Sequence, residues 1–342
     1  MEKTLQELCP ELVKKGIECR VVCLNKCANS VKCLPAKDEF KGVKIERLPF
    51  TGLGPYKIAL GAYGKAGDCD VIHVHGLGFF SDLFLLTKLL HKKKVVISSY
   101  GGVFHTGSNP LKWFYFNVWN RVLLEFADRV VAISGHDAKL FGEIAGKEKI
   151  ELIPVPVELE KFKPGKKKEN QFVFVGRLSK NKRVDLLIKA FKKTKDNNAK
   201  LLIAGNDFEG IQTKLEAPAS GDSRIEFLGA VSEEKLKLLL AESEFFVSAS
   251  DYESFGISAV EAMKAGCIPV LSGISSFRDF LDGNKNGFEV NFHPGSAGRE
   301  LEKIMAFDRN KLRAKRDSSL EYVERFRAEK IAEKISKLYF SL

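Results

Sequence analysis

The sequence lacks the long apolar runs of a membrane-spanning protein and the pattern of a secretory signal. Residues 1–16 instead form an amphipathic helical pattern in which Glu and Lys recur throughout. The chain also lacks any C-x-x-C pair, and its seven cysteines are an odd number. We therefore expect a cytoplasmic protein whose thiols are reduced.

Metal-ligating patterns are scarce as well. The cysteines Cys19, Cys23, Cys27 and Cys33 lie close together, but their spacing matches no zinc motif and no histidine is near them in sequence. His73 and His75 would share one face of a strand, without an evident third ligand. We expect packing rather than metal binding at these positions, and neither a metal nor a cofactor for the protein.

The formal net charge is +11, yet the chain has no dense basic tail. Residues 1–160 carry 22 Lys+Arg against 18 Asp+Glu, and the remainder carries 33 against 26, so the excess is spread over both halves. Aromatic residues interleaved with Lys and Arg, which would indicate nucleic-acid binding, are not evident. A phosphate-bearing substrate or an anionic membrane surface explains the sign of the charge, and nucleic acid is the least favoured partner.

Short β-branched runs alternate with helical patterns along the whole chain, which is typical of parallel sheets covered by helices on both faces. The expected strands of the first half are 18–24, 43–48, 70–75, 94–99, 130–134 and 150–157. Those of the second half are 171–175, 200–204, 224–228, 245–248, 268–271 and 287–290. Expected helices include 184–193, 233–242 and 257–265, and a long helical stretch covers 310–339.

A length of 342 residues favours two domains over one. The charged segment Glu158–Asn170, which contains Pro164-Gly165, is the best linker between the two series of strands. We expect an α/β fold of two Rossmann-like, doubly wound domains, residues 1–160 and 161–325, that face a cleft. Residues 326–342 would form a C-terminal helix that packs back toward the first domain.

The most informative segment runs from Phe246 to Val270. A strand ends there at a sharp turn, Ser254-Phe255-Gly256, and a helix follows, so free backbone N–H groups and a positive helix end are presented to a ligand. Such a turn binds phosphate, and Gly256 lets the ligand approach closely. The carboxylates of Glu253 and Glu261 flank the turn and would repel phosphate, so we expect them to bind the hydroxyls of a sugar or a ribose. The segment therefore predicts a site for a sugar nucleotide.

A second motif follows the strand 171–175. The loop from Gly176 to Lys182 places Arg177 and Lys182 just beyond the carboxyl end of that strand, where a diphosphate would lie. Arg can clamp phosphate oxygens with its planar guanidinium, and Lys adds a point charge. Such a loop alone is more often a solvated surface, but unlike groups that converge in one domain favour a ligand site.

These motifs resemble those of the retaining glycosyltransferases of family 4, also called glycosyl transferases group 1, which have the GT-B fold. The resemblance covers the second half through Gly176–Lys182, Phe227–Val231, Ser250–Gly256 and Glu261–Val270, and the two glutamates have the family's E-x7-E spacing. The first half is similar more weakly, through Asp70–Gly76, Gly101–His105 and Asp128–Ser134.

The resemblance implies transfer of a hexosyl unit from a nucleoside-diphosphate sugar to a hydroxyl of a glycan or lipid-linked acceptor, with retention at the anomeric carbon and without a metal. Arg177 and Lys182 would neutralise the leaving diphosphate, and Glu253 would hold the donor sugar. Further donor-binding groups would be Gly176, Val231, the backbone N–H groups of Phe255, Gly256 and Ile257, and Glu261, which would bind the ribose.

The chain departs from the family's pattern at its start. Family members begin with a strand and a Gly-rich loop, whereas this sequence begins at the helix that follows, so we expect a first domain without its first, central strand. Tyr100 stands where the family has a histidine that faces the donor sugar. The residues expected on the sugar or acceptor side are Tyr100, Gly101, Gly102 and His105.

Two questions stay open from the sequence. Because of these departures, the alternative to an enzyme is a non-catalytic remnant of the family that binds a nucleotide sugar or a partner. The aromatic run Trp113–Trp119 has a spacing that is more often found in a core, but it could also contact lipid or the acceptor. We expect a cytoplasmic enzyme, with contact to the inner face of an anionic membrane as a further option.

Overall fold

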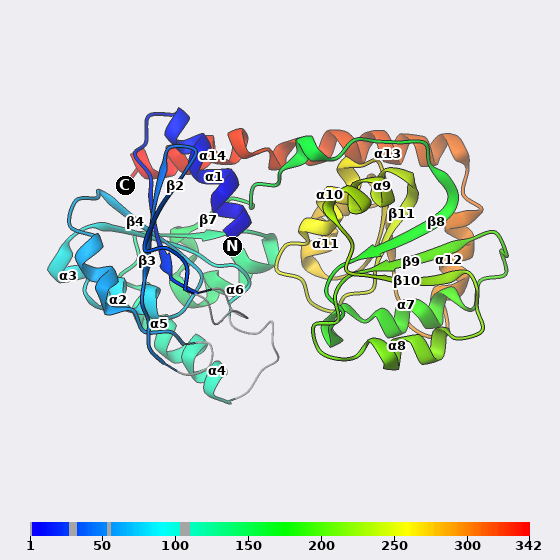
Figure 1. The fold of residues 1–342 in the computed structure, drawn as a ribbon, viewed down its shortest axis with the longest axis horizontal. Coiled ribbons are helices and arrows are strands. Elements are labelled where there is room, and N and C mark those ends of the chain that lie inside the picture. The colour runs from blue at the N-terminus through cyan, green and yellow to red at the C-terminus, as the bar shows by residue number, and fades with distance from the viewer. Residues whose placement is uncertain (1, 27–32, 53–55, 103–109) are drawn as a thin grey trace. The chain divides into compact units, whose positions relative to one another are not determined.

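The computed structural model describes residues 2–26, 33–52, 56–102 and 110–342. The chain forms two compact units (Figure 1). Unit 1 combines residues 1–156 with residues 328–342, and unit 2 comprises residues 157–327, so the chain passes between the units twice. No helix within the described ranges is long and apolar enough to cross a bilayer.

Unit 1 contains two sheets and a set of helices. Its strands are β1 (Arg20–Leu24), β2 (Lys37–Phe40), β3 (Val43–Leu48), β4 (Val71–His75), β5 (Lys94–Ser98), β6 (Arg129–Ala132) and β7 (Ile150–Leu152). Its helical elements are α1 (Glu2–Lys14), η1 (Leu60–Lys65), α2 (Phe79–Leu86), α3 (Lys88–His91), α4 (Pro110–Phe114), the π-helical η3 (Tyr115–Trp119), α5 (Asn120–Leu124), α6 (Gly135–Ala145), η4 (Lys147–Lys149) and α14 (Ala328–Phe340).

The two sheets of unit 1, together with the residues just before β1, contribute side chains to the same two apolar clusters. One has the order β1-β3-β2 and the other the parallel order β4-β5-β6-β7, so β1 and β4 are both edge strands. Val22 of β1 packs on the same apolar cluster as Val74 of β4, and on the opposite face Cys19, just before β1, packs on the same cluster as Val71. In the described part of the chain no strand pairs with the free edge of β1 or of β4.

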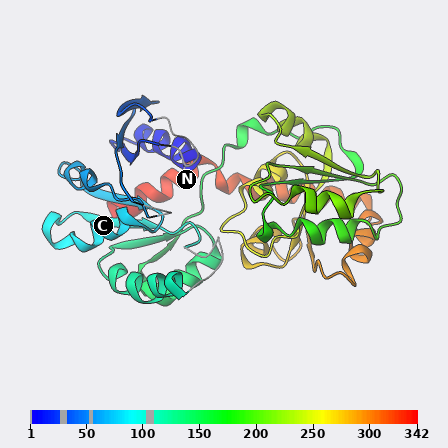
Figure 2. The same cartoon turned by 60° about the horizontal axis from the view of Figure 1, so that its bottom comes forward.

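Helices cover both faces of the four-stranded sheet. On one face, α2, η3, α5 and α6 contribute side chains to an apolar cluster. On the other face, α1 and α14 pack against each other and against the sheet, as Figures 1 and 2 show. The last helix therefore joins the first one in unit 1, although more than 300 residues separate them in the sequence.

Unit 2 is a doubly wound domain around one parallel sheet of order β10-β9-β8-β11-β12-β13. Its strands are β8 (Lys168–Val175), β9 (Lys200–Ala204), β10 (Ile225–Gly229), β11 (Ser243–Ser248), β12 (Ile268–Ser272) and β13 (Phe288–Val290). Its helical elements are η5 (Leu159–Lys161), η6 (Lys180–Lys182), α7 (Val184–Phe191), α8 (Gln212–Ala219), α9 (Glu233–Glu242), α10 (Ile257–Lys264), α11 (Ser275–Leu281), α12 (Ala297–Met305), α13 (Arg309–Val323) and η7 (Glu324–Phe326).

The central strands of unit 2 contain apolar runs, residues 172–174 and 245–247, that are buried because both faces of the sheet are covered. Phe172 and Phe245 stack in the core with ring centroids 4.7 Å apart, and α7, α8 and α12 pack over that face. Helices α9, α10 and α13 lie on the other face (Figure 1). Parallel strands buried on both sides are what continuous apolar runs predict.

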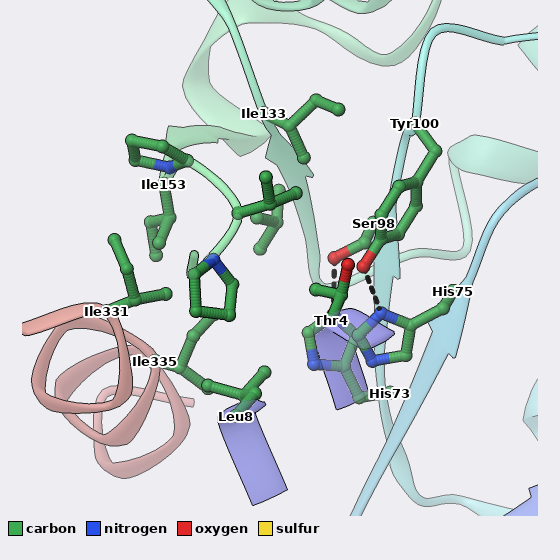
Figure 3. A pocket seen from close by; sticks show the side chains of 14 residues that line it. Thr4, Leu8, His73, His75, Ser98, Tyr100, Ile133, Ile153, Ile331 and Ile335 are labelled. Atoms are coloured by element: carbon green, nitrogen blue, oxygen red, sulfur yellow. Dashed lines mark hydrogen bonds between the residues drawn. The ribbon is translucent and has the colours of Figure 1, made fainter. Parts of the chain in front are cut away.

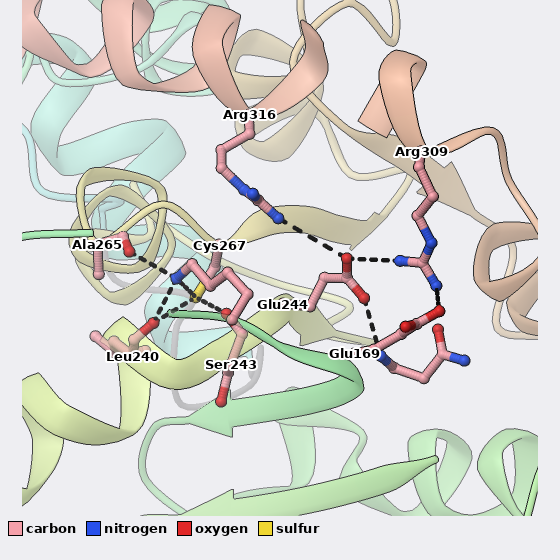
Figure 4. A network of polar contacts seen from close by, with 10 residues as sticks. Glu169, Leu240, Ser243, Glu244, Ala265, Cys267, Arg309 and Arg316 are labelled. Atoms are coloured by element: carbon pink, nitrogen blue, oxygen red, sulfur yellow. Dashed lines mark hydrogen bonds and ion pairs between the residues drawn. The ribbon is translucent and has the colours of Figure 1, made fainter. Parts of the chain in front are cut away.

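A polar network fixes α13 to the amino ends of β8 and β11 (Figure 4). The buried Glu244 carboxylate accepts from Arg309 Nη1 at 2.8 Å and from the Asn170 backbone N–H at 2.9 Å, and Arg316 Nη2 lies 3.8 Å from it. Beside it, Lys167 Nζ donates to the carbonyl oxygens of Leu240 and Ala265. Burial lowers the pKa of Lys167, and these carbonyls satisfy its ammonium.

The structure differs from the sequence predictions at four places. Strand 150–157 ends at Leu152, because Pro154 and Pro156 have no N–H to donate to a ladder. The segment Glu158–Asn170 is not a free linker, since it lies within unit 2 and includes the start of β8. The helical stretch 310–339 breaks at Arg327 into α13 and α14. The strand β2 was not predicted, because it is charged and exposed.

Candidate active site

The strand order of unit 2 creates a point where two connections diverge. From β8 the chain moves to β9 and β10 on one side, and it then returns to β11 on the other side of β8. The loops that follow β8 and β11 lead to helices on opposite faces of the sheet, and ligands of open parallel sheets bind beyond the carboxyl ends of the strands at such a point. Residues 176–183 and 249–256 form these two loops.

Direct contacts join the two loops. The Asp251 backbone N–H donates to the Asn181 carbonyl at 3.0 Å, and Asn181 Nδ2 donates to the Tyr252 carbonyl at 3.2 Å. The Lys182 ammonium forms an ion pair with Glu253 Oε1, and their side chains are only 14% and 17% exposed. The predicted cation and the predicted carboxylate thus meet at the same end of the sheet.

Two serines position Glu253. Ser250 Oγ donates to Glu253 Oε1 at 3.4 Å, and Ser276 Oγ donates to the Glu253 carbonyl at 2.9 Å. Ser250 is fully buried, and its own carbonyl accepts from Ser272 Oγ at 2.5 Å. The loop is therefore held from both sides, which keeps the carboxylate at the sheet edge.

Helix α10 begins beside this carboxylate. Gly256 is its N-cap with φ = +106°, and no side chain caps the helix, so its amino end is open to a ligand. A Cβ at Gly256 would lie 2.9 Å from Phe277 Cε1, so both the conformation and the space require glycine. The Phe255 ring packs on Phe280 and Phe326, which anchors the turn. Ile257 is exposed at the helix start and Glu261 is half-buried within the helix.

Arg177 belongs to the loop that follows β8. Its guanidinium carbon is 4.6 Å from the centroid of the Phe208 ring, a stacked cation–π arrangement that holds a long side chain in place. Arg177 is otherwise exposed, so its donors can reach a ligand.

Glycines line the carboxyl ends of three neighbouring strands. The Gly176 N–H donates to Ala204 at 3.0 Å, and the Gly205 N–H donates to Gly229 at 2.8 Å. A Cβ on Gly205 would lie 1.7 Å from the Gly176 carbonyl oxygen, so only glycine fits there. Because these glycines have no side chains, a ligand can approach the backbone at this edge of the sheet. Val231 lies just after β10, the last of the three strands.

Sequence reasoning missed several residues of this site. Phe208 supports Arg177, Asn181 and Ser276 tie the loops together, and Gly205 permits the close approach of two strands. Gly205 carried a signal, because it directly follows a predicted strand in the same way as Gly176. The other three carried none, since their roles depend on contacts between segments that lie far apart in the sequence.

The residues expected on the sugar or acceptor side belong to unit 1. Tyr100, Gly101 and Gly102 follow β5 and all have positive φ, and the Gly101 N–H donates to the buried Asp137 carboxylate at 3.0 Å. Burial raises the pKa of Asp137, which opposes the effect of its hydrogen bonds from Ser99 and Gly101. His105 lies outside the described residues.

The Tyr100 hydroxyl borders a small cavity shared with a histidine pair (Figure 3). It is hydrogen-bonded to His75 Nδ1 at 3.0 Å, and the rings of His73 and His75 are stacked at 4.3 Å. Burial lowers the pKa of His75 to about 4 and that of His73 well below its ordinary value. Both rings are therefore neutral near pH 7. His73 is hydrogen-bonded to the hydroxyl groups of Ser98 and Tyr339, and His75 to that of Tyr100.

Neither the cysteines of the first unit nor the histidine pair forms a metal site in the described residues. Within the described ranges, no group of three or more His, Cys, Asp and Glu side chains is arranged to hold a metal ion. The cysteines in those ranges are free thiols, and Cys27 falls outside them. The absence of a metal requirement stays a prediction.

Comparison with known proteins agrees with this architecture. Residues 156–320 match the family model "Glycosyl transferases group 1", and residues 1–161 match the family model "Glycosyltransferase Family 4". Together the two matches cover nearly the whole chain.

One curated relative and two solved structures are especially similar. The GDP-mannose:cellobiosyl-diphosphopolyprenol alpha-mannosyltransferase of Xanthomonas oryzae pv. oryzae (strain PXO99A) is 32% identical over 308 residues, which is 86% of this chain and 80% of the relative. Sucrose-phosphate synthase from Thermosynechococcus elongatus superposes with a TM-score of 0.79 at 20% identity, over 97% of this chain and 90% of that chain. Anabaena HepE, solved with UDP and glucose, gives 0.75 at 18% identity, over 98% and 96%.

The family models and the curated relative establish the family, while the two structures establish the fold. They give no support to the non-catalytic alternative, because the relative is named as a mannosyltransferase and this chain aligns with four fifths of its length. This chain belongs to the family 4 glycosyltransferases of the GT-B fold, and it is a nucleotide-sugar-dependent transferase.

Proposed function

We propose that the protein is a retaining hexosyltransferase whose donor diphosphate binds at the carboxyl ends of β8 and β11. The observation that carries the proposal is the contact between Lys182 and Glu253, which joins a cationic loop to an acidic loop beside the open end of α10. A diphosphate needs the cationic loop, and the sugar attached to it needs the acidic loop. The E-x7-E pair and the basic loop therefore serve one ligand.

Each side chain has a distinct role in this proposal. Arg177 and Lys182 neutralise the charge that develops on the leaving phosphate, together with the N–H groups of Gly256 and Ile257 at the start of α10. Glu253 accepts hydrogen bonds from the donor sugar, held in place by Ser250 and Ser276. Glu261 binds the ribose, and the segment around Val231 borders the base.

The reaction breaks the bond between the anomeric carbon and the phosphate oxygen. The electron pair of that bond leaves with the diphosphate, which also takes the proton of the acceptor hydroxyl as the new glycosidic bond forms. Loss of one fixed group that stabilises this charge lowers rates by about 10²- to 10³-fold in other enzymes. The proposed chemistry needs no protein nucleophile and no metal.

The first donor to test is GDP-mannose, and the first acceptor is an oligosaccharide linked to a polyprenyl diphosphate. Both come from the name of the relative that is 32% identical. A lipid-linked acceptor places the reaction at a membrane surface, so the enzyme would act as a peripheral protein at the cytoplasmic face.

Transfer from labelled nucleotide sugars to a diphosphopolyprenyl disaccharide tests the proposal. We expect one donor to be used, and NMR of the product to show an α-linkage when the donor sugar is α-linked. A β-linked product would contradict retention. Donor binding without transfer or hydrolysis for every nucleotide sugar would contradict catalysis and support the non-catalytic alternative.

A further inference from the structure

Unit 1 exposes most of the large apolar side chains that the described part of the chain leaves in contact with solvent. Most of them lie between Tyr56 and Phe126, with Leu34, Leu152 and Phe340 outside that range, whereas unit 2 exposes only Phe208, Leu238 and Ile257 in this class. Exposed apolar residues that gather in one part of a protein mark an interaction surface, while scattered ones do not. The clustering therefore needs an explanation that the donor site does not supply.

The main part of this surface is the helical segment from Pro110 to Leu124, formed by α4, η3 and α5. Its inner side buries Phe116 and Leu123. Its outer side carries a stripe of exposed apolar residues at helical spacing: Leu111, Phe114, Val118 and Val122, with exposed fractions of 75%, 52%, 40% and 59%. The core interpretation of the aromatic run thus holds for Phe116 but not for Phe114 or Trp113, which is 58% exposed.

Helix α3 extends the stripe. Lys88 forms an ion pair with Asp128, which fixes α3 beside the carboxyl end of the segment near Phe126. The next two residues, Leu89 and Leu90, are 75% and 73% exposed. Figure 1 shows α2, α3, α4 and α5 gathered on the same side of unit 1, and α2 contacts both α3 and α5. We call this surface, formed by α3 and residues 110–126, the apolar face.

Hydrogen bonds to a buried carboxylate turn the polar groups of Tyr56, Tyr115 and Trp119 inward. The buried Asp82 carboxylate accepts from the Tyr56 hydroxyl at 2.7 Å, the Tyr115 hydroxyl at 2.9 Å and Trp119 Nε1 at 3.2 Å. Because these donors are already satisfied within the protein, the outward parts of the rings are hydrocarbon. Covering them with an apolar phase costs no hydrogen bond.

The charges around the apolar face are mostly positive. Residues 83–94 contain no Asp or Glu, and the one acidic residue among residues 110–126 is Glu125, whose carboxylate lies 3.5 Å from Lys149 Nζ. The basic residues of the two segments are Lys88, Lys92, Lys93, Lys94, Lys112 and Arg121. Lys92 and Lys93 form no ion pair within the described ranges, and Arg121 donates to the Glu143 backbone carbonyl rather than to a carboxylate. An apolar surface with a basic border fits an anionic lipid bilayer, in which the border contacts headgroups.

We propose that the apolar face docks unit 1 onto an anionic membrane, with the stripe in the acyl boundary and Lys92 and Lys93 at the headgroups. This inference rests on the proposed function for the idea of a lipid-linked acceptor, but the surface itself is independent of the donor site. No helix of the described chain crosses the bilayer, so this attachment is peripheral. It brings the enzyme to the surface at which a polyprenyl-linked acceptor is held.

The sequence offers a built-in probe, because both of its tryptophans, Trp113 and Trp119, lie on the apolar face. We expect vesicles of phosphatidylcholine with about one third phosphatidylglycerol to pellet the full-length protein and to shift its tryptophan emission to the blue, and pure phosphatidylcholine to do so much less. Brominated lipids should quench the emission. Absence of pelleting and of any spectral change with anionic vesicles would overturn the proposal.

Matched variants localise the contact. Leu111→Ser/Phe114→Ser should weaken binding to anionic vesicles by about tenfold or more, and Lys92→Glu/Lys93→Glu should do the same. The control Leu238→Ser/Phe340→Ser removes a leucine and a phenylalanine that are 63% and 80% exposed elsewhere, and it should bind as the wild type does. Equal binding by all three variants would refute the assignment.

Two further measurements separate this inference from its rivals. Analytical ultracentrifugation without lipid tests whether a second copy covers the apolar face. The membrane assignment would be overturned if the wild type forms a dimer and does not bind vesicles, and if Leu111→Ser/Phe114→Ser abolishes that dimer. Titration with nucleotide sugar tests the donor site of the same variant. If Leu111→Ser/Phe114→Ser binds the donor but not vesicles, the inference is supported. If the wild type binds the donor but not vesicles, the inference is wrong and the proposed function still stands.

Discussion

The ion pair between Lys182 and Glu253 gives the sharpest test of the donor site. Lys182→Met removes the ammonium and keeps an apolar side chain of similar length. Because the two side chains are only 14% and 17% exposed, the change leaves a largely buried carboxylate without its cation. We expect a loss of unfolding free energy of about 1–3 kcal/mol, between the values of exposed and fully buried pairs.

The catalytic effect of the same change should be larger. If Lys182 stabilises the leaving diphosphate, kcat should fall by about 10²- to 10³-fold, which corresponds to about 2.7–4 kcal/mol of transition-state stabilisation. The double variant Lys182→Met/Glu253→Gln removes the unpaired charge, so it should regain much of the lost stability. It should not regain activity, because the cation is still missing.

The measurements are urea unfolding and steady-state transfer for the wild type, both single variants and the double variant. Lys180→Met is the matched control, since Lys180 is an exposed lysine of the same loop. A double variant that recovers activity together with stability would refute the role of Lys182, because the pair would then be structural. A single variant with kcat within about fivefold of the wild type would refute it equally.

Three further predictions concern stability. Glu244→Ala should cost about 2–4 kcal/mol in urea unfolding because the buried carboxylate joins two arginines and a backbone N–H, whereas Glu169→Ala, the exposed partner of the same arginine, should cost less than about 1 kcal/mol. Gly256→Ala should cost about 2–4 kcal/mol and weaken donor binding in calorimetry, because the new Cβ meets Phe277 at positive φ. His75 has a folded-state pKa of about 4, below its ordinary value of 6.5. The free energy of unfolding should therefore be unaffected by His75 above about pH 6.5 and should decrease as the pH falls toward 4, because the unfolded state binds the proton more readily. Urea unfolding midpoints should show this pH dependence, and His75→Gln should flatten it.

These stability predictions can fail in distinct ways. Equal losses for Glu244→Ala and Glu169→Ala would mean that burial of the carboxylate does not matter. An unchanged unfolding midpoint in Gly256→Ala would show that the turn can relax. A pH slope that persists in His75→Gln would assign that slope to other groups.

Much of unit 2 could be predicted from the sequence because each of its central strands contains a short apolar run. The expected strands and the observed ones agree closely, and the turn at Gly256 begins a helix as expected. The pairing of Lys182 with Glu253 could be anticipated only in part. The sequence placed both residues at the carboxyl ends of strands, but the adjacency of β8 and β11 is a property of the sheet order.

Unit 1 was harder to predict for physical reasons. The charged edge strand β2 has no apolar alternation, and the prolines after Leu152 end β7 early. The aromatic segment 110–124 has the same helical spacing whether its stripe faces a core or solvent, so only the contacts of Phe116 and Asp82 decide its orientation. Supporting residues such as Phe208 have no signature, because their function lies in a contact with another loop.

The most direct test of the central claim is a crystal structure of the protein with a bound nucleoside-diphosphate sugar. We expect a diphosphate within hydrogen-bonding distance of Arg177, Lys182 and the backbone N–H groups at Gly256 and Ile257, with the sugar against Glu253. A nucleotide whose diphosphate lies away from the carboxyl ends of β8 and β11 would contradict it.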